Sequence, residues 1–295
     1  MSDLLPVSFT YDLENHLESE DQARYERPTR QFMDLWADRG VRGTVFIVGE
    51  VARRSPNLIR EIADAGHEIG YHSHCHRPLE IETPERFRQE TADDRAFMED
   101  LTGKPVVGYR APSLSLTRTA VWTTDILADL GFRYSSSVLP AHSPIYGFPG
   151  APLAPFKWRS GLIELPTPIF PTRFWGVPYI GGVYLRYVPA ALIRMAHSCQ
   201  PKDNVLPWCY LHAHDIDAEE PFGRVRHASL MTSLLLWMNR SGTYAKIERL
   251  FGAGGALPLG GPLIERIENE LDTDALPFFD PDRDLGRHPR QAAAE

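Results

Sequence analysis

Short hydrophobic runs alternate with amphipathic stretches along the first 135 residues of the chain. The runs are rich in β-branched and aromatic residues and predict strands at residues 6–11, 43–49, 67–71, 106–110 and 132–135. Between them, apolar residues recur at helical spacing and predict helices at residues 25–39, 56–65, 83–101 and 117–130. Strands and helices in turn indicate a parallel sheet or a β/α barrel.

The alternation stops at residue 139. Residues 139–189 are rich in proline, glycine and aromatic residues, which predicts a loop-rich insertion that forms a wall or lid over a site. Regular patterns return as a helix, a strand and a second helix, expected at residues 189–197, 206–211 and 225–239. We therefore expect one α/β domain at residues 1–272. The rest, residues 273–295, is expected to be an ordered arm or a disordered tail.

Charge and composition narrow the choice of partners. The net charge of −8, from 31 basic and 39 acidic residues, argues against nucleic acid. No apolar run is long enough to predict a membrane span, and the segment Met1–Pro6 lacks the basic start of a signal peptide. The three cysteines form no CxxC pair. These features predict a cytoplasmic protein, and the sequence leaves its oligomeric state open.

The densest group of candidate metal ligands lies in the segment Gly66–His76, which holds four histidines and a cysteine. His72 and His76 are four residues apart. In a strand they would be about 13 Å apart, too far to share one ion. On a helical turn their Cβ atoms would be about 5–6 Å apart. A shared metal therefore requires the chain to leave the strand after Gly70 and coil.

Other reactive side chains also follow predicted strands, namely Asp12, Glu14, Arg110 and His212. In a β/α barrel the carboxyl ends of the strands converge on one face, where such enzymes hold their active sites. One carboxylate and two imidazoles suit a catalytic zinc or a related divalent ion. The pattern therefore predicts a metal site at this face.

Four motifs occur in a distinctive order: Thr10-Tyr11-Asp12-Leu13-Glu14, His72-Ser73-His74-Cys75-His76, Arg110-Ala111-Pro112-Ser113 and Tyr210-Leu211-His212. In this order they resemble the polysaccharide deacetylase family, the NodB-type carbohydrate esterases, and its subgroup with an Asp-x-Glu first motif. The resemblance implies a distorted (β/α) barrel. It also implies hydrolysis of an acetamide on an N-acetylated sugar or oligosaccharide, with Zn²⁺ or another divalent metal as cofactor.

The resemblance also implies a role for each matching residue. His72 and His76 would bind the metal, and Asp12 would be the general base that takes a proton from the attacking water. His212 would be the general acid that protonates the departing amine. Arg110 would pair with Asp12 and keep it ionised.

Two positions depart from the family pattern. Its commonest first motif has two adjacent aspartates, whereas here Leu13 follows Asp12. Residues two apart in a strand share a face, so Glu14 is the expected third ligand, with Asn15 at the position where the related subgroup carries an aspartate. Ser135 stands where relatives often have an aspartate, and serine cannot supply the charge that raises the pKa of a partner histidine.

The remaining predictions concern the substrate. The backbone N–H of Ser113 is the candidate donor to the oxyanion. Trp175 and Tyr179 fit either a platform for a sugar ring or the core of the insertion itself. His214 is predicted to stack on the substrate, and it is also the alternative to His212 as the acid.

These features support the hypothesis of a cytoplasmic N-deacetylase that acts on an amino sugar, for instance in a precursor of a surface glycan. Two alternatives stay open. One is hydrolysis of another linear or cyclic amide, and the other is a catalytically inactive homologue that binds glycan through the insertion.

Overall fold

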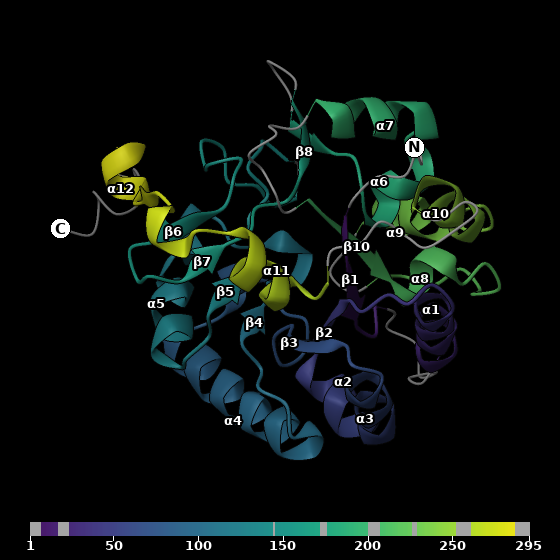
Figure 1. The fold of residues 1–295 in the computed structure, drawn as a ribbon, viewed down its shortest axis with the longest axis horizontal. Helices are drawn as coiled ribbons and strands as arrows, with labels where there is room; N and C mark the ends of the chain where they lie inside the picture. Colours follow the sequence, from purple (N-terminus) through teal and green to yellow (C-terminus); the bar gives the residue numbers. More distant parts are fainter. Residues whose placement is uncertain are drawn as a thin grey trace.

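The computed structural model describes residues 7–16, 24–143, 145–171, 176–199, 207–225, 229–251 and 261–286. At its centre lies a nine-stranded sheet in the order β10-β1-β2-β3-β4-β5-β7-β6-β11 (Figure 1). Its strands are β1 (Ser8–Leu13), β2 (Thr44–Ile47), β3 (Glu68–Tyr71), β4 (Gly108–Tyr109), β5 (Tyr134–Ser135), β6 (Phe156–Trp158), β7 (Ile163–Glu164), β10 (Trp208–His212) and β11 (Phe278–Phe279). All neighbours are parallel except β6 and β7. The predicted α/β fold with a parallel sheet is confirmed.

Five helices cover the outer side of strands β1 to β5 (Figure 1). They are α1 (Glu26–Asp38), α2 (Gly49–Arg54), α3 (Pro56–Asp64), α4 (Pro84–Thr102) and α5 (Trp122–Asp129). Helix α4 shows how the sequence sets their ends. Thr83 Oγ1 accepts the Arg86 N–H at 3.3 Å, Pro84 occupies the first turn, and Gly103 ends the helix with a φ of 64°.

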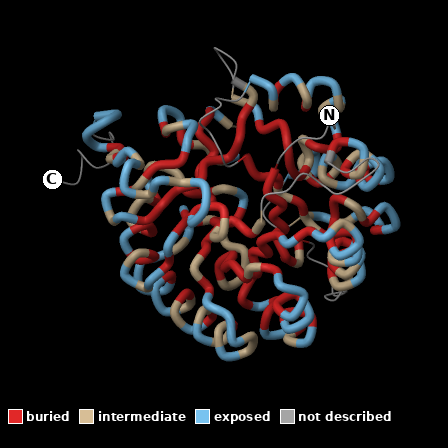
Figure 2. The backbone as a smooth tube through the Cα atoms, in the orientation of Figure 1, coloured by how far each residue is buried: buried red, intermediate tan, exposed pale blue. Residues whose placement is uncertain are grey.

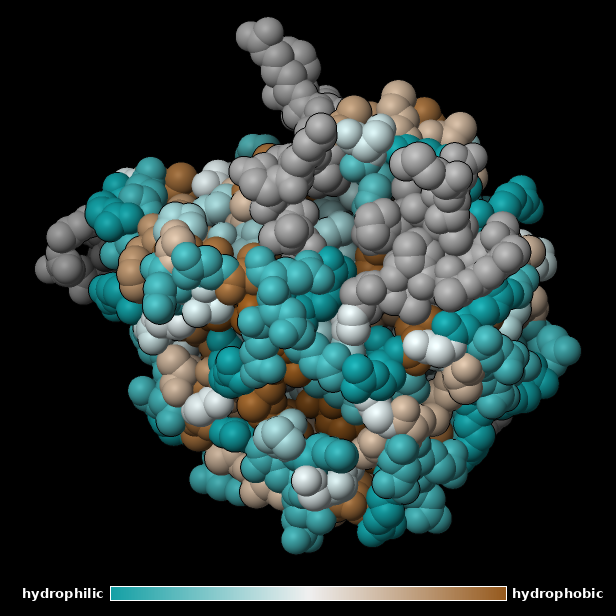
Figure 3. All heavy atoms as spheres, in the orientation of Figure 1, coloured by the Kyte–Doolittle hydropathy of each residue, from teal (hydrophilic) through white to brown (hydrophobic). Residues whose placement is uncertain are grey.

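A second group of helices surrounds β10: α6 (Gly182–Tyr187), α7 (Ala190–Ser198), α8 (Ala213–Ile216), α9 (Leu230–Trp237) and α10 (Thr243–Phe251). The expected helix at residues 225–239 is shorter in the structure because it begins after Ser229, whose side chain caps Thr232 N–H. None of the described helices is both long and apolar enough to cross a bilayer. Hydrophilic side chains predominate on the face in Figure 3, with hydrophobic ones between them.

Helix α11 (Leu263–Glu270) closes the amino-terminal end of the sheet. The Leu263 N–H donates to Thr44 Oγ1 at 2.8 Å, and the Ile264 N–H donates to Glu68 Oε2 at 3.2 Å. These contacts lie where β2 and β3 begin. The carboxyl ends of the strands, on the opposite side, are left to form the site.

The insertion at residues 139–189 contains more regular structure than its composition suggested. It supplies β6 and β7 to the main sheet, and the antiparallel pair β8 (Ile169–Pro171) and β9 (Gly176–Pro178). β11 from the carboxyl-terminal segment pairs with β6, and Phe279 packs on Phe156 and Trp158 with ring centroids 5.3 and 5.8 Å apart. Residues 273–286 are therefore ordered and extend the core, which Figure 2 shows as buried backbone through the middle of the molecule.

Candidate metal and catalytic site

The chain turns sharply after β3, and the turn brings His72 and His76 together. β3 ends at Tyr71, and Ser73 and His76 take left-handed backbone conformations with φ of 63° and 57°. The two imidazole centroids are 5.0 Å apart. The coiling that a shared metal requires is thus present, as a turn instead of a helix.

Glu14, which follows β1, completes a group of three potential ligands. Its Oε2 contacts His76 Nε2 and lies 3.7 Å from His72 Nε2, and the three ligand atoms are all within 4.8 Å of one another. Burial favours the neutral acid, but His76 and His72 outweigh it and hold the pKa of Glu14 well below its usual range. The carboxylate is therefore ionised between the two rings.

The donor set fits a divalent cation. His72 Nδ1 lies 2.8 Å from the carbonyl oxygen of Arg110, which can only accept, so Nδ1 carries a proton and Nε2, which faces Glu14, is the nitrogen that could bind a metal. Glu14 Oε2 is buried and makes no hydrogen bond of good geometry within the described part of the chain. A buried, ionised oxygen beside two ring nitrogens that can act as ligands is an arrangement that a divalent cation would fit. Asn15 also lines the cavity, but the residue that groups with His72 and His76 is Glu14.

His74 points away from this group and supports the turn. Its Nδ1 lies 2.8 Å from Oδ2 of Asp94, a buried residue of α4 that also pairs with Arg53 at 2.7 Å. The Tyr71 hydroxyl donates to the same Asp94 oxygen at 3.2 Å. Asp94 thus anchors the turn at residues 72–76 to α4, a role that the sequence did not reveal.

Arg110 holds Asp12 at the floor of the site. Its Nη1 donates to Asp12 Oδ1 at 2.6 Å, and its Nε and Nη2 donate to the backbone and side-chain oxygens of Ser136 at 3.1 and 3.0 Å. The guanidinium is sandwiched between the rings of Phe46 and Trp208, 4.1 and 4.2 Å from their centroids. This buried cation fixes the direction of the Asp12 carboxylate.

His212 is paired with Asp215, a residue that the sequence reasoning missed. His212 Nδ1 and backbone N each lie 2.9 Å from Asp215 Oδ2, while Arg186 Nε lies 3.2 Å from the other oxygen. Burial alone would lower the pKa of His212, but the hydrogen bond and charge of Asp215 raise it to about 9. His212 Nε2 lies 3.7 Å from Asp12 Oδ2. The sequence feature that could have identified Asp215 is its position three residues after His212, where β10 ends and α8 begins.

Ser135 has a different role from the aspartate that relatives carry there. Its hydroxyl donates to Ser137 Oγ at 2.8 Å, and Ser137 Oγ in turn accepts the Ala111 N–H at 2.8 Å. Glu164 accepts the Ser137 N–H at 2.7 Å. These residues fix the backbone beside Arg110. The negative charge that raises the pKa of His212 belongs to Asp215 instead.

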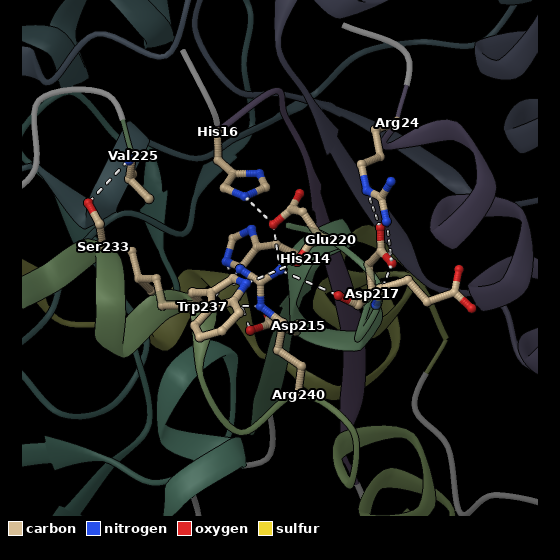
Figure 4. A network of polar contacts seen from close by, with 12 residues as sticks. His16, Arg24, His214, Asp215, Asp217, Glu220, Val225, Ser233, Trp237 and Arg240 are labelled. Carbon is tan, nitrogen blue, oxygen red and sulfur yellow. Dashed lines mark hydrogen bonds and ion pairs between the residues drawn. The ribbon is translucent and has the colours of Figure 1, made fainter. Parts of the chain in front are cut away.

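His214 lies in a stack of three imidazoles. Its ring is parallel to that of His212 at 4.7 Å and lies 4.2 Å from that of His16, whose Nε2 is 3.1 Å from Glu220 (Figure 4). Arg240 also pairs with Glu220. Burial and the neighbouring His16 hold the pKa of His214 well below its usual value, so this ring is neutral. His16 also forms part of the cavity wall.

One cavity of about 540 Å³ is lined by Asp12, Glu14, His72, His76, His212 and His214. Its floor is polar, and much of its wall is apolar: Leu114, Leu139, Ile145, Val183, Tyr184 and Leu236. Ser113 lies on the rim, in a left-handed turn with φ 54°. Trp175 lies outside the described residues. Of the two roles left open for Tyr179, its placement favours the core: the residue is buried, only 1% exposed, with its hydroxyl 3.3 Å from His197 Nδ1.

Comparisons with known proteins divide the chain into two parts. Residues 7–135 match the family described as polysaccharide deacetylase, and residues 136–254 match a domain of unknown function (DUF3473). The candidate metal ligands Glu14, His72 and His76 lie in the first part, whereas the three neighbouring imidazoles of His16, His212 and His214 come from both parts.

Individual relatives match short stretches. A peptidoglycan-N-acetylglucosamine deacetylase of Bacillus cereus is 26% identical over 98 residues, 33% of this chain and 36% of the relative. The peptidoglycan-N-acetylmuramic acid deacetylase PdaA of Bacillus subtilis is 32% identical over 84 residues, 28% of this chain and 32% of the relative. The chain thus covers about a third of the length of these curated relatives.

The fold is similar to a crystal structure from Mycobacterium smegmatis that is assigned to the polysaccharide deacetylases. The TM-score is 0.57 and the identity 20%, over 92% of each chain. At this identity the likeness concerns the fold alone.

Proposed function

We propose that this chain, whose residues 7–135 match the polysaccharide deacetylase family, is a metal-dependent hydrolase that removes the N-acetyl group from an amino sugar. One observation carries the proposal: an ionised carboxylate and two imidazole nitrogens lie within 4.8 Å of one another, beside the candidate base and the candidate acid. The relatives named above are deacetylases of peptidoglycan amino sugars, which supports this class of substrate.

Glu14, His72 and His76 would hold the metal. A divalent ion bound there polarises the acetamide carbonyl and makes a nearby water more acidic. The cavity of about 540 Å³ is large enough for a sugar residue with part of its neighbour.

Asp12 is placed to accept a proton from the attacking water. Arg110 holds its Oδ1, which leaves Oδ2 free to face the cavity and His212. As the water oxygen bonds to the carbonyl carbon, one water proton passes to Asp12. The Ser113 backbone N–H is the proposed donor to the carbonyl oxygen as it gains negative charge.

His212 is placed to protonate the leaving group. Its raised pKa keeps Nε2 protonated near neutral pH, and Asp215 holds the ring by Nδ1. When the carbon–nitrogen bond breaks, the nitrogen takes the Nε2 proton. The products are acetate and the free amine. The neutral state of His214 favours His212 over it as the acid.

The release of acetate tests this proposal. Purified protein with added Zn²⁺ is incubated with N-acetylated sugars that are nucleotide-linked, lipid-linked, oligomeric or polymeric. We expect acetate from at least one of them, and none from the double variant His72→Ala, His76→Ala. Glycan binding without acetate release from any substrate would favour an inactive homologue. Release from finished external polymer alone would argue against a cytoplasmic precursor as the substrate.

A further inference from the structure

Glu164 is a fully buried acidic residue that no step of the proposed reaction uses. It lies on β7 opposite Ser135 of β5 and is 0% exposed. Its Oε1 accepts the backbone N–H groups of Ser137 and Val138 at 2.7 and 2.9 Å, and its Oε2 accepts the Trp158 Nε1–H at 3.0 Å. Acidic side chains are almost never fully buried unless partners compensate them, so these three donors account for the burial of Glu164.

The two backbone donors belong to a buried segment, residues 136–138, that follows β5. The segment begins at Ser136, whose N–H donates to the Tyr109 carbonyl of β4 at 2.9 Å. Its three residues are all 0% exposed. Buried backbone N–H groups need an acceptor, and here one oxygen of Glu164 serves two neighbouring residues. The Glu164 side chain therefore fixes both the position and the direction of this segment.

Ser136 is the part of the segment that reaches the support of the candidate base. Its carbonyl oxygen and Oγ accept Nε and Nη2 of Arg110, while Nη1 of the same guanidinium donates to Asp12. The rings of Phe46 and Trp208 lie over the guanidinium. Ring contacts restrain movement out of the guanidinium plane, whereas rotation within the plane is restrained by hydrogen bonds. The oxygens of Ser136 therefore decide whether Nη1 points at Asp12.

These contacts cross from one matched part of the protein to the other. Asp12 and Arg110 lie within residues 7–135, whereas Ser136 and Glu164 lie within residues 136–254, which match the domain of unknown function. The described residues that line the cavity do not include Glu164. Its effect on Asp12 therefore passes through the segment 136–138 and Arg110.

We propose that Glu164 is a positioning residue for Asp12, which it directs through the segment 136–138 and Arg110. This role rests on the proposed function, in which Asp12 takes a proton from the attacking water. A displacement of about 1 Å at a reacting group can cost about 100-fold in rate, even when the altered residue is far from the chemistry. Because Glu164 does not line the described cavity, its loss should lower kcat and leave KM nearly unchanged.

The exchange of the Arg110 Nε–H with solvent tests this role without any substrate. The group donates to the Ser136 carbonyl at 3.1 Å in a residue only 1% exposed, so its NMR signal, identified by its absence from Arg110→Lys, should exchange slowly in the wild type. Glu164→Ala removes the acceptor of both backbone N–H groups and should speed the exchange at least about tenfold. Glu164→Asp withdraws the oxygen by one carbon and should speed the exchange as well, which keeps the test open if Glu164→Ala does not fold. Glu164→Gln keeps an oxygen for both groups and should retain most of the protection.

Trp158→Phe is the matched control. It removes the donor to the other oxygen of Glu164 and disturbs the same part of the core, but it leaves the oxygen that holds Ser137 and Val138. The Arg110 signal should therefore stay protected. In the acetate assay, Glu164→Ala should lower kcat at least about tenfold with KM within about threefold, and Trp158→Phe should stay within about twofold of the wild type in both.

Three results would overturn the proposal: unchanged Arg110 exchange in Glu164→Ala and Glu164→Asp, an equal change in Trp158→Phe, or a normal kcat in a Glu164 variant whose Arg110 exchanges rapidly. A wild type that releases no acetate from any substrate would instead refute the proposed function. The exchange of the Arg110 Nε–H would then still decide whether Glu164 directs Arg110.

Discussion

The charge of Asp215 sets the protonation of His212, and Asp215→Asn removes that charge while keeping the size of the side chain. The amide oxygen of asparagine can still accept the His212 backbone N–H, now 2.9 Å from the carboxylate, so the start of α8 is preserved. What is lost is the negative charge 2.9 Å from Nδ1. The substitution therefore changes the electrostatics of His212 far more than the fold.

The magnitude follows from the pKa of His212. In the native protein this pKa is raised to about 9. A return to the ordinary value of about 6.5 would reduce the protonated fraction at pH 7.5 from about 97% to about 9%. Because the acid works only when protonated, kcat/KM at pH 7.5 should fall roughly tenfold. The activity should also decline above about pH 6.5 instead of about pH 9.

The assay is the pH profile of kcat/KM from pH 5.5 to 10, measured by released acetate. Asp215→Glu, which restores the charge, should recover much of the alkaline range. Ser135→Ala is the matched control, because Ser135 bonds Ser137 and should not move the profile. An NMR titration of the His212 ring gives the pKa directly. An alkaline limb that is the same in Asp215→Asn and wild type would refute the assignment of Asp215.

Three further predictions concern separate parts of the site. Asp12→Asn should reduce kcat by about 10²–10⁴-fold while metal stays bound, because only the proton acceptor is lost; a normal kcat would exclude Asp12 as the base. Glu14→Gln should weaken Zn²⁺ binding by at least about 100-fold in a calorimetric titration, and unchanged affinity would mean that the ligand lies elsewhere. Tyr179→Phe should leave KM unchanged and lower the free energy of unfolding by about 1 kcal/mol, through the lost contact with His197; a raised KM would return Tyr179 to the substrate.

The sequence predicted the fold well where local patterns decide it. Alternating apolar runs and capped helices placed β1 to β5 and the helices α1, α3, α4 and α5 with small errors at the ends, whereas the short helix α2 was not predicted. The strands β6, β7 and β11 were not predicted, because each is only two or three residues long and is stabilised by partners distant in sequence. Phe279, for example, is buried by Trp158, 121 positions earlier.

The site was predictable to the extent that its ligands occur in short motifs. The spacing of His72 and His76, and the shared face of Asp12 and Glu14, follow from backbone geometry alone. Asp215 was missed because an aspartate three residues after a histidine is common, and only the fold shows its oxygen at Nδ1. The role of Tyr179 stayed open because an aromatic side chain suits a sugar platform and a core equally well.

The most direct test of the account is the release of acetate by metal-free protein as Zn²⁺ is added in steps to an N-acetylated oligosaccharide assay. The account predicts no release without metal, a rate that rises until one ion is bound per chain, and no rise in Glu14→Gln at the same additions. Two results would contradict the account. One is full activity without metal; the other is a wild-type protein that binds one ion at Glu14, His72 and His76 and still releases no acetate from any acetylated glycan.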